Sequence, residues 1–418
     1  MTALTIEKTT QNRTAYLNAL REKYVPIFER IAAGAALRDA TRALPHDEIN
    51  ELATAGFGAL RVPVTHGGAG LSLPEFFDLL TDLAAADSNI AQAMRGHFAF
   101  VEDRLVAADN ADQHVWFQRF VAGELVGNAW TEIGEVALGE VNTKVSLDAD
   151  GKFRVNGTKY YSTGSIFAQW IDTYAQRTDT GARVIAVVDA HQPHVELADD
   201  WDGFGQRTTG TGTTYFNDAE VSEANLIDFD TRFKYQTAFY QAVLLAVLAG
   251  SVQGATAEFG QELKNRKRTF SHAASTSANE DPQLLQVIGE VSAAAFTAKA
   301  TLNATASSLE AAYQSALALR DGEGSVDEDL AANDEAELAS AQGQVVLVPL
   351  VTSALSRAFD ALAASATSNT KNLDRYWRNA RTAGNHNPWV FKARLIGEQV
   401  VHGRNLPRVW AIGASETK

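Results

Sequence analysis

The spacing of apolar residues changes twice along the chain, and this change constrains the fold more than any other feature. Between about residues 126 and 230, apolar and polar residues alternate with the period of two that β-strands require. On either side, apolar residues recur three and four positions apart, which is the spacing of an amphipathic helix. The sequence therefore predicts three consecutive domains: helical over 1–125, β over 126–232 and helical over 233–418. A chain of 418 residues is long enough for each domain to bury a core.

The middle region carries turn signals as well as alternation. The stretch "KVSLDADGKFRVNGTKYYSTG" (144–164) holds an Asp-Gly and an Asn-Gly pair, which are the strongest local signals for a β-hairpin. The alternation continues in "ARVIAVVDA" (182–190), "HVELADDWDGFG" (194–205) and "TGTTYFNDAEV" (211–221). We interpret this region as a small antiparallel, barrel-like β domain.

The flanking regions carry helix start and stop signals. "LPHDEINELATAGF" (44–57) opens with acidic residues and closes at a glycine, as helices prefer. The glycines and prolines of 58–73 predict a loop, and helical spacing restarts over 74–106 with a proline in the first turn. The apolar run "AVLLAVLAG" (242–250) is far shorter than the ~20 residues of a membrane span, so it predicts a buried helix.

Two polar segments interrupt the helices of the last third. The stretch 271–282 predicts a polar loop, and the acidic stretch "DGEGSVDEDLAANDEAE" (321–337) predicts a second, solvated loop. The alternative for the second stretch is a calcium site. It lacks the regular carboxylate spacing and the closing glutamate of such a loop, so we favour solvated surface.

Composition excludes several classes of function. The net charge of -15 argues against a nucleic-acid partner, which would require a basic face. The chain has no cysteine, which excludes disulfides, thiolate metal sites and a thiol nucleophile. Its nine histidines are scattered without metal-ligand spacing, so no metal is expected. The first residues lack the pattern of a secretory signal, and we expect a cytoplasmic protein without a membrane anchor.

Four stretches resemble the acyl-CoA dehydrogenase superfamily. They are "VPVTHGGAGLSLPEFFDLLTDLAAADSNIAQAM" (62–94), "NAWTEIG" (128–134), "VNGTKYYSTGS" (155–165) and "WRNARTAG" (377–384). The second and third resemble the two segments of that family that cover a flavin ring. The resemblance implies an α+β fold with an N-terminal helical domain, a middle antiparallel β domain and a C-terminal four-helix bundle.

The position of the catalytic base separates the branches of this family. In the dehydrogenases a glutamate follows the C-terminal arginine stretch, and an ungapped comparison places it at Asn387, whose amide cannot act as a base. The alternative place for that glutamate, 237–245, contains no acid. With His386 at this place, "DRYWRNARTAGNHNP" (374–388) resembles the flavin-dependent monooxygenase branch, of the dibenzothiophene monooxygenase type. That type has a second histidine where this chain has Ala383.

The resemblance assigns roles to single residues. It implies that His386, Asn128, Thr163 and His97 take part in catalysis or line the substrate side. The residues that it implies for flavin binding are Asn128, Trp130, Thr131, Thr163, Trp201, Arg268, Phe270 and Arg378, with Arg268 reaching the flavin phosphate of a neighbouring subunit. Plainer alternatives remain open: His97 as a structural histidine, Trp201 as a core aromatic and Arg268 as the partner of a surface acid.

The resemblance also implies an activity and a cofactor. It implies the oxygenase component of a two-component monooxygenase, which receives reduced flavin from a separate NAD(P)H:flavin reductase. Such an enzyme forms a flavin C4a-(hydro)peroxide with O2. The expected reaction is oxygenation of a small organic substrate at its sulfur atom. Alternatives are nitrogen or carbon hydroxylation, an acyl-CoA dehydrogenase, and a non-catalytic flavin-binding relative. The stretch 362–377 lacks the glycine pair that approaches a dinucleotide, which favours FMN over FAD. A homotetramer built through the C-terminal bundle is expected.

Overall fold

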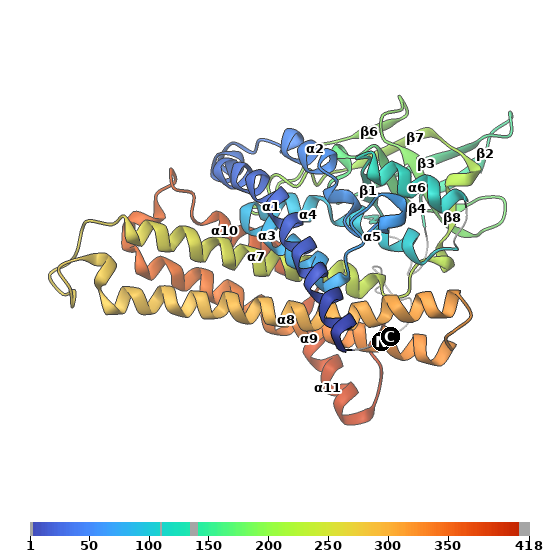
Figure 1. Ribbon diagram of the computed structural model, residues 1–418. Coiled ribbons are helices and arrows are strands. Elements are labelled where there is room, and N and C mark those ends of the chain that lie inside the picture. Colours follow the sequence, from blue (N-terminus) through green and yellow to red (C-terminus); the bar gives the residue numbers. More distant parts are fainter. Residues whose placement is uncertain (1–2, 109–110, 134–140, 409–418) are drawn as a thin grey trace.

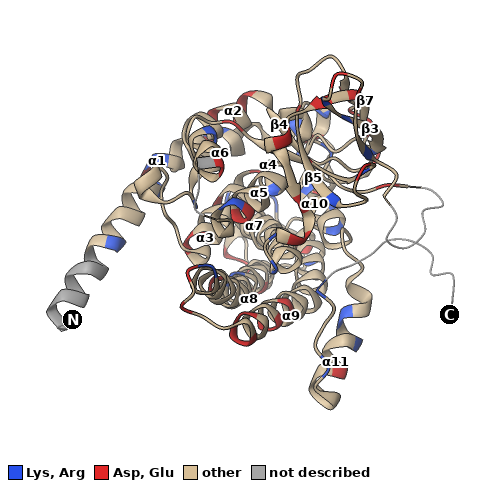
Figure 2. Ribbon diagram, turned by 90° about the vertical axis from the view of Figure 1, so that its right-hand side faces the viewer, with Lys and Arg blue, Asp and Glu red and all other residues tan. Residues whose placement is uncertain are grey.

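The protein has the predicted α+β architecture in a computed structural model that describes residues 3–108, 111–133 and 141–408 (Figure 1). An N-terminal helical part and a sheet lie against one side of a bundle of long helices. Acidic and basic residues are interspersed over the elements that face the viewer in Figure 2.

The helices of the N-terminal part are short after the first one. Asp87 ends α3, accepts a hydrogen bond from the Asn89 amide as the cap of α4 and pairs with Arg38. A second break at Met94 separates α4 from α5, so the stretch 74–106 forms three helices instead of one. The helices are α1 (Ala3–Thr41), α2 (His46–Thr54), α3 (Leu73–Ala86), α4 (Ser88–Ala93), α5 (Arg95–Val106) and α6 (Ala111–Val121).

The middle region forms a mixed sheet rather than a purely antiparallel one. Its strands are β1 (Val126–Ala129), β2 (Lys144–Leu147), β3 (Phe153–Lys159), β4 (Trp170–Arg177), β5 (Arg183–Asp189), β6 (Val195–Leu197), β7 (Thr214–Val221) and β8 (Leu226–Asp228). They are ordered β6-β7-β3-β2-β4-β5-β8, and β1 also pairs with β4. The pairs β1–β4 and β2–β4 are parallel, and in each pair the connection between the strands is longer than a hairpin, as parallel pairing requires.

The Asn-Gly pair at 156–157 is not a turn, which corrects the hairpin prediction at this point. It lies inside β3, where the register with β7 shifts and Asp218 becomes the extra residue of a β-bulge with φ of 66°. The Asn156 side chain accepts the Asp218 amide hydrogen at 2.8 Å. A Cβ on Gly157 would lie 2.8 Å from the Cα of Thr143, so glycine permits the close approach of two backbones.

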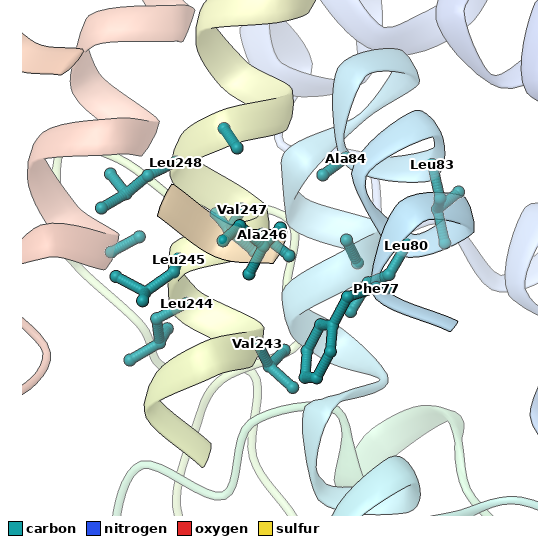
Figure 3. Packing of buried hydrophobic residues seen from close by; sticks show 14 of the residues in the cluster. Phe77, Leu80, Leu83, Ala84, Val243, Leu244, Leu245, Ala246, Val247 and Leu248 are labelled. Atoms are coloured by element: carbon teal, nitrogen blue, oxygen red, sulfur yellow. The ribbon is translucent and has the colours of Figure 1, made fainter. Parts of the chain in front are cut away.

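The C-terminal bundle is built around α7 (Gln236–Lys264). Its other members are α8 (Pro282–Arg320), α9 (Val326–Ala358) and the shorter α10 (Arg375–Gly384), followed by α11 (Lys392–His402). Figure 3 shows Val243, Ala246 and Val247 of α7 facing Phe77, Leu80 and Ala84 of α3, while Leu244, Leu245 and Leu248 point to the other side. The apolar run 242–250 is therefore a buried helix, as predicted.

Helix α7 can approach α3 closely because it carries two glycines one turn apart. A Cβ on Gly250 would lie 2.4 Å from the Ala84 Cβ, and one on Gly254 would lie 2.4 Å from the Ala85 carbonyl oxygen. By length and composition alone, α7 and the segment 326–361 could each cross a membrane, but 78% of the apolar window of α7 is buried inside the protein. That burial is typical of a core helix in a bundle.

The acidic stretch 321–337 is largely helical, which corrects its interpretation as a solvated loop. Helix α9 begins at Val326 behind a capping box of Ser325 and Glu328. Because Asp329 and Glu337 lie two turns apart, both face inward, where they pair with Lys234 and Lys392. A carboxylate is tolerated in the interior when a cation from another segment neutralises it.

A buried ionic cluster joins the three parts of the fold. Arg232, in the segment that leads into α7, donates to Asp172 of β4 at 3.0 Å and lies 3.5 Å from Asp103 of α5. Trp130, just after β1, donates its indole N–H to the other oxygen of Asp172 at 2.8 Å. The guanidinium of Arg232 also lies 5.1 Å from the Trp130 ring. Arg232 therefore ties α5, the sheet and the bundle together.

Replacing the central cation tests this role. Arg232→Met would leave Asp172 buried without a compensating cation and Asp103 with Arg104 alone, so we expect a loss of about 3–5 kcal/mol in unfolding free energy. Arg357→Met, which removes exposed pairs with Glu290 and Asp360, should cost less than about 1 kcal/mol. Urea denaturation followed by circular dichroism measures both. Equal losses in the two variants would contradict the cluster's role.

Candidate active site

The two segments predicted to cover a flavin ring meet in space. The Tyr160 amide donates to the Thr131 carbonyl at 2.8 Å, which joins 128–133 to 155–165; Gly134, the end of the first motif, lies outside the described residues. The Ser165 hydroxyl donates to the Asn128 carbonyl at 3.1 Å. Together these bonds hold the ends of β1 and β3 in one wall of the candidate site.

Aromatic rings and hydroxyl groups line this wall. The ring of Trp130 is held by Asp172 and stacks at 5.8 Å on Tyr174. The Thr163 hydroxyl bonds to that of Thr211 at 2.9 Å, which bonds in turn to Thr209 at 2.7 Å. In each of these two contacts either hydroxyl can be the donor.

Tyr161 and Trp201 form a more exposed part of the same region. Tyr161 is 50% exposed, has a φ of 58° and meets Trp201 edge-on at 6.2 Å. A tyrosine in the left-handed region is a strained conformation of the kind that clusters at functional sites. Trp201 donates its indole N–H to the Gly205 carbonyl at 3.0 Å.

Asn128 brings an unpartnered polar atom into the site. Its side chain is buried, and its Oδ1 has no hydrogen-bond partner within the described part of the chain. Gly96 of α5 packs against it: a Cβ at that position would lie 2.7 Å from the Oδ1. A buried, unsatisfied oxygen in a well-packed interior is costly, so it marks a place where a ligand can donate a hydrogen bond.

Arg95 and His386 form the centre of the site, where α5 meets the segment after α10. Arg95 Nη2 lies 2.9 Å from His386 Nε2. Because a guanidinium only donates, Nε2 must be the acceptor, so the proton of the neutral ring lies on Nδ1, 3.3 Å from Asn387 Oδ1. Although the residue as a whole is exposed, desolvation of its ring by the surrounding protein and the charge of Arg95 lower the pKa of His386 well below its usual range. His386 is therefore neutral at physiological pH.

Tyr240 of α7 completes this group, which we call the Arg95 cluster: Arg95, Asn128, Trp130, Tyr240 and His386. The Arg95 guanidinium lies 4.9 Å from the centre of the Tyr240 ring, which is 6.1 Å from the Trp130 ring. The Tyr240 hydroxyl is buried without a partner among the described residues, and burial raises its pKa, so it stays protonated. The sequence analysis missed Arg95 and Tyr240; an arginine inside the apolar stretch "AQAMRGHFAF" was the available signal.

Asn387 holds the cluster to the bundle. Its side-chain amide donates to Gln241 Oε1 at 2.8 Å, and its carbonyl accepts from Gln344 at 3.1 Å. These bonds connect the segment that carries His386 to both α7 and α9. At the position where the sequence comparison expects the glutamate of a dehydrogenase, this chain thus has an amide that connects the His386 segment to the bundle.

His97 uses both ring nitrogens within the fold. Its Nε2–H donates to the Gly58 carbonyl at 2.9 Å, and its Nδ1 accepts the Val126 amide hydrogen at 3.2 Å. Burial lowers the pKa of His97 to about 4. The ring also borders a small, mostly apolar cavity of ≈ 10 Å³ with Met94 and Phe167. Because both ring nitrogens are occupied, His97 could contact a substrate only through the carbon atoms of its ring. Its place on the substrate side stays a prediction.

The remaining predicted residues lie apart from the Arg95 cluster. Arg378 is engaged with Asp39 at 2.7 Å, with Asp374 at 2.7 Å and with the Phe204 carbonyl at 3.0 Å. Arg268 and Phe270 are exposed in the loop between α7 and α8, and no described contact brings them to the cluster. Their roles in flavin binding remain predictions.

A larger cavity lies elsewhere. It has a volume of ≈ 640 Å³ and lies between α6 and the outer strands, bordered by Trp116, Arg119 and Trp170. It contains none of the predicted site residues and none of the unpartnered polar atoms described above. Chemistry rather than size therefore places the candidate active site at the Arg95 cluster.

The neutral state of His97 predicts a pH dependence of stability. An unfolded histidine has a pKa of about 6.5, so the unfolded chain takes up the proton first as the pH falls. The stabilisation is complete above pH 6.5 and is lost between there and about pH 4, by up to about 1.4 kcal/mol per pH unit. In His97→Gln the fall of unfolding free energy over this range should be shallower than in the unchanged protein and in the exposed control His191→Gln. Parallel slopes would contradict the assignment.

Comparison with known proteins agrees with this architecture. The N-terminal domain of acyl-CoA dehydrogenase matches residues 18–124 and its C-terminal domain matches 242–390. Dibenzothiophene monooxygenase of Rhodococcus erythropolis is 24% identical over 397 residues, which is 90% of this chain and 92% of the relative. The probable FMNH2-dependent monooxygenase SfnC of Pseudomonas putida is 24% identical over 385 residues, which is 90% of this chain and 93% of the relative.

Solved structures share the whole fold. FMN-bound TdsC of Paenibacillus sp. A11-2 superimposes with a TM-score of 0.82 at 23% identity, over 93% of this chain and 98% of the other. The methanesulfinate monooxygenase MsuC of Pseudomonas fluorescens gives a TM-score of 0.81 at 23% identity, with the same coverage. With both terminal domains matched and the helix–sheet–helix order in place, this chain belongs to the acyl-CoA dehydrogenase family.

Proposed function

We propose that this protein is the oxygenase component of a two-component, FMNH2-dependent monooxygenase. FADH2 is the second choice of cofactor. A separate NAD(P)H:flavin reductase supplies the reduced flavin, and one atom of O2 is transferred to a small organic substrate, at sulfur. The observation that carries the proposal is the composition of the Arg95 cluster: a neutral histidine and unpartnered amide and phenol groups, with no carboxylate.

The lack of a base argues against the dehydrogenase alternative. Removal of an α-proton from an acyl thioester requires a carboxylate or another base near the substrate. Asn387 is an amide bound to Gln241, and the start of α7 carries no acid. The buried carboxylates Asp103 and Asp172 are both engaged with Arg232. No free carboxylate therefore serves the cluster within the described residues.

The residues of the wall fit a flavin. Trp130, Tyr161 and Trp201 offer aromatic surface, and Asn128 Oδ1 and Ser162 Oγ are buried polar atoms without a partner in the described structure. A reduced flavin supplies the electrons that activate O2. FMN is favoured over FAD by the absence of glycines in 362–377 and by two relatives, the probable FMNH2-dependent monooxygenase SfnC and FMN-bound TdsC.

The chain's own residues would hold and shield the reaction. His386 carries a proton on Nδ1, the Asn128 side chain can take part in a hydrogen bond with a bound group, and the phenol of Tyr240 can donate one. The rings of Trp130 and Tyr240 meet edge-on with their centres 6.1 Å apart, and they would shield this part of the site from water. These are the conditions that oxygen transfer requires.

Sulfur is favoured as the oxygenated atom because of the named relatives. Dibenzothiophene monooxygenase and methanesulfinate monooxygenase are named for sulfur compounds. Hydroxylation at nitrogen or carbon is the alternative, and a nitrososynthase from Micromonospora carbonacea shares the fold with a TM-score of 0.72. A homotetramer is also part of the proposal. Exposed Phe296 of α8 and Val400 and Val401 of α11 support a subunit interface on the bundle.

Replacement of His386 tests the proposed activity. His386→Gln keeps an acceptor for Arg95 but removes the ring proton, so we expect product per FMNH2 oxidised to fall by at least about 100-fold, while hydrogen peroxide rises. FMN affinity, measured by quenching of flavin fluorescence, should change less than about threefold.

The assay uses a generic flavin reductase, FMN, NADH and a panel of organic sulfur compounds, with product and peroxide quantified together. The exposed His402→Gln variant is the control and should behave as the unchanged protein does. If His386→Gln and the unchanged protein give the same ratio of product to peroxide, His386 has no role in oxygen transfer. If no compound in the panel is oxygenated by the unchanged protein, sulfur oxygenation itself is wrong.

A further inference from the structure

Arg95 differs from the other buried arginines of the protein. Within the described residues, the arginines that are buried are Arg38, Arg61, Arg95, Arg104, Arg232 and Arg375. Each of the others pairs with a carboxylate, as Arg61 does with Glu102 and Arg375 with Glu258. Arg95 is 6% exposed and forms no ion pair in the described structure. The fold therefore neutralises its other interior guanidinium groups and leaves this one uncompensated.

The contacts of Arg95 leave donors free. Its Nη2 donates to His386 Nε2, its face lies against Tyr240, and its Nε is buried without a hydrogen-bond partner. A guanidinium stays protonated even in a protein interior. An unpaired buried charge costs several kcal/mol, so it persists where a ligand compensates it.

The free charge lies within the proposed site. Its neighbour Gly96 packs against Asn128, and His386 and Tyr240 contact it directly. A ligand that reaches Arg95 therefore also lies beside the groups that surround the reaction. A neutral aromatic sulfide would leave the charge uncompensated, whereas an oxyanion would compensate it with a charge-assisted hydrogen bond.

We propose that Arg95 binds the negatively charged group of the substrate, and that this substrate is a small organic sulfinate. The proposal rests on the proposed function and narrows its substrate class. A sulfinate has two oxygens that can accept hydrogen bonds from the guanidinium, and its sulfur keeps a lone pair for oxygenation. A sulfonate has no such lone pair and can only be the product.

The reaction balances with the components already named. In RSO2⁻ + O2 + FMNH2 → RSO3⁻ + FMN + H2O, one S–O bond forms and the O–O bond breaks. Sulfur loses two electrons and FMNH2 loses two more, which together reduce both atoms of O2. The two hydrogens of FMNH2 leave with the second oxygen atom as water.

Two ligands of similar shape separate the contribution of the ligand's negative charge to binding from that of its shape. Benzenesulfinate and methyl phenyl sulfoxide share a ring and a sulfur lone pair, but only the first is an anion. Binding of each is measured by isothermal titration calorimetry without flavin, so the result does not depend on turnover. We expect Arg95→Met to weaken benzenesulfinate binding by at least about 30-fold and sulfoxide binding by less than about threefold. Arg95→Lys should give an intermediate loss of sulfinate binding, because it keeps the charge but not the two-pronged geometry.

A matched control and a folding check accompany these variants. Arg394→Met removes an exposed arginine of α11 and should leave both affinities unchanged. Loss of an uncompensated charge should leave the melting temperature of Arg95→Met equal to or above that of the unchanged protein. In turnover, the preference of kcat/KM for sulfinate over sulfoxide should be reversed in Arg95→Met.

Three results would overturn the proposal. The first is benzenesulfinate binding that is equal in the unchanged protein and Arg95→Met. The second is a loss of FMN affinity in Arg95→Met with sulfinate affinity retained, which would assign Arg95 to the flavin. The third is a preference of the unchanged protein for the sulfoxide. Arg95-dependent sulfinate binding without oxygenation of any sulfur compound would support the binding site and refute the proposed function, so the two failures are distinguishable.

Discussion

The buried contact of Arg232 with Asp103 and Asp172 is the interaction on which the geometry of the molecule depends. It connects a helix, a strand and the entry to the bundle at one point, and it also orients Trp130 through Asp172. Asp103 and Arg95 lie on the same helix α5, two turns apart. The buried contact of Arg232 therefore fixes the position of Arg95 relative to the wall that Trp130 and Asn128 form.

Local patterns predicted the elements but not their partners. The helix–strand–helix order, the stop of α2 near Gly56 and the burial of 242–250 follow from periodicity and end signals within a few residues. The parallel pairing of β1 with β4 could not be predicted, because it joins segments more than forty residues apart in the sequence. The acidic stretch of α9 was misread for a similar reason: the lysines that neutralise Asp329 and Glu337 come from distant segments.

The site was predictable to a different degree for each residue. Resemblance located His386 and Asn128, and the structure places both in the Arg95 cluster. The hydrogen bonds of His97 could not be predicted from the sequence, because their partners are backbone groups of η1 (Phe57–Ala59) and β1, and only the fold brings these elements to His97. The significance of Arg95 lies in a missing carboxylate. The sequence shows that Arg95 is present, but its lack of a carboxylate partner in the described structure becomes evident only when the positions of all its neighbours are known.

The glycine pair of α7 bears on how such proteins can exchange parts. Gly250 and Gly254 let the α3 backbone lie directly against α7, although α3 belongs to the N-terminal matched domain and α7 to the C-terminal one. A chimera that took its N-terminal helices from one relative and its bundle from another would bring together two surfaces shaped for different partners. A chimera that kept α3 and α7 from the same relative would preserve this contact, whereas a junction between the two matched domains would divide it.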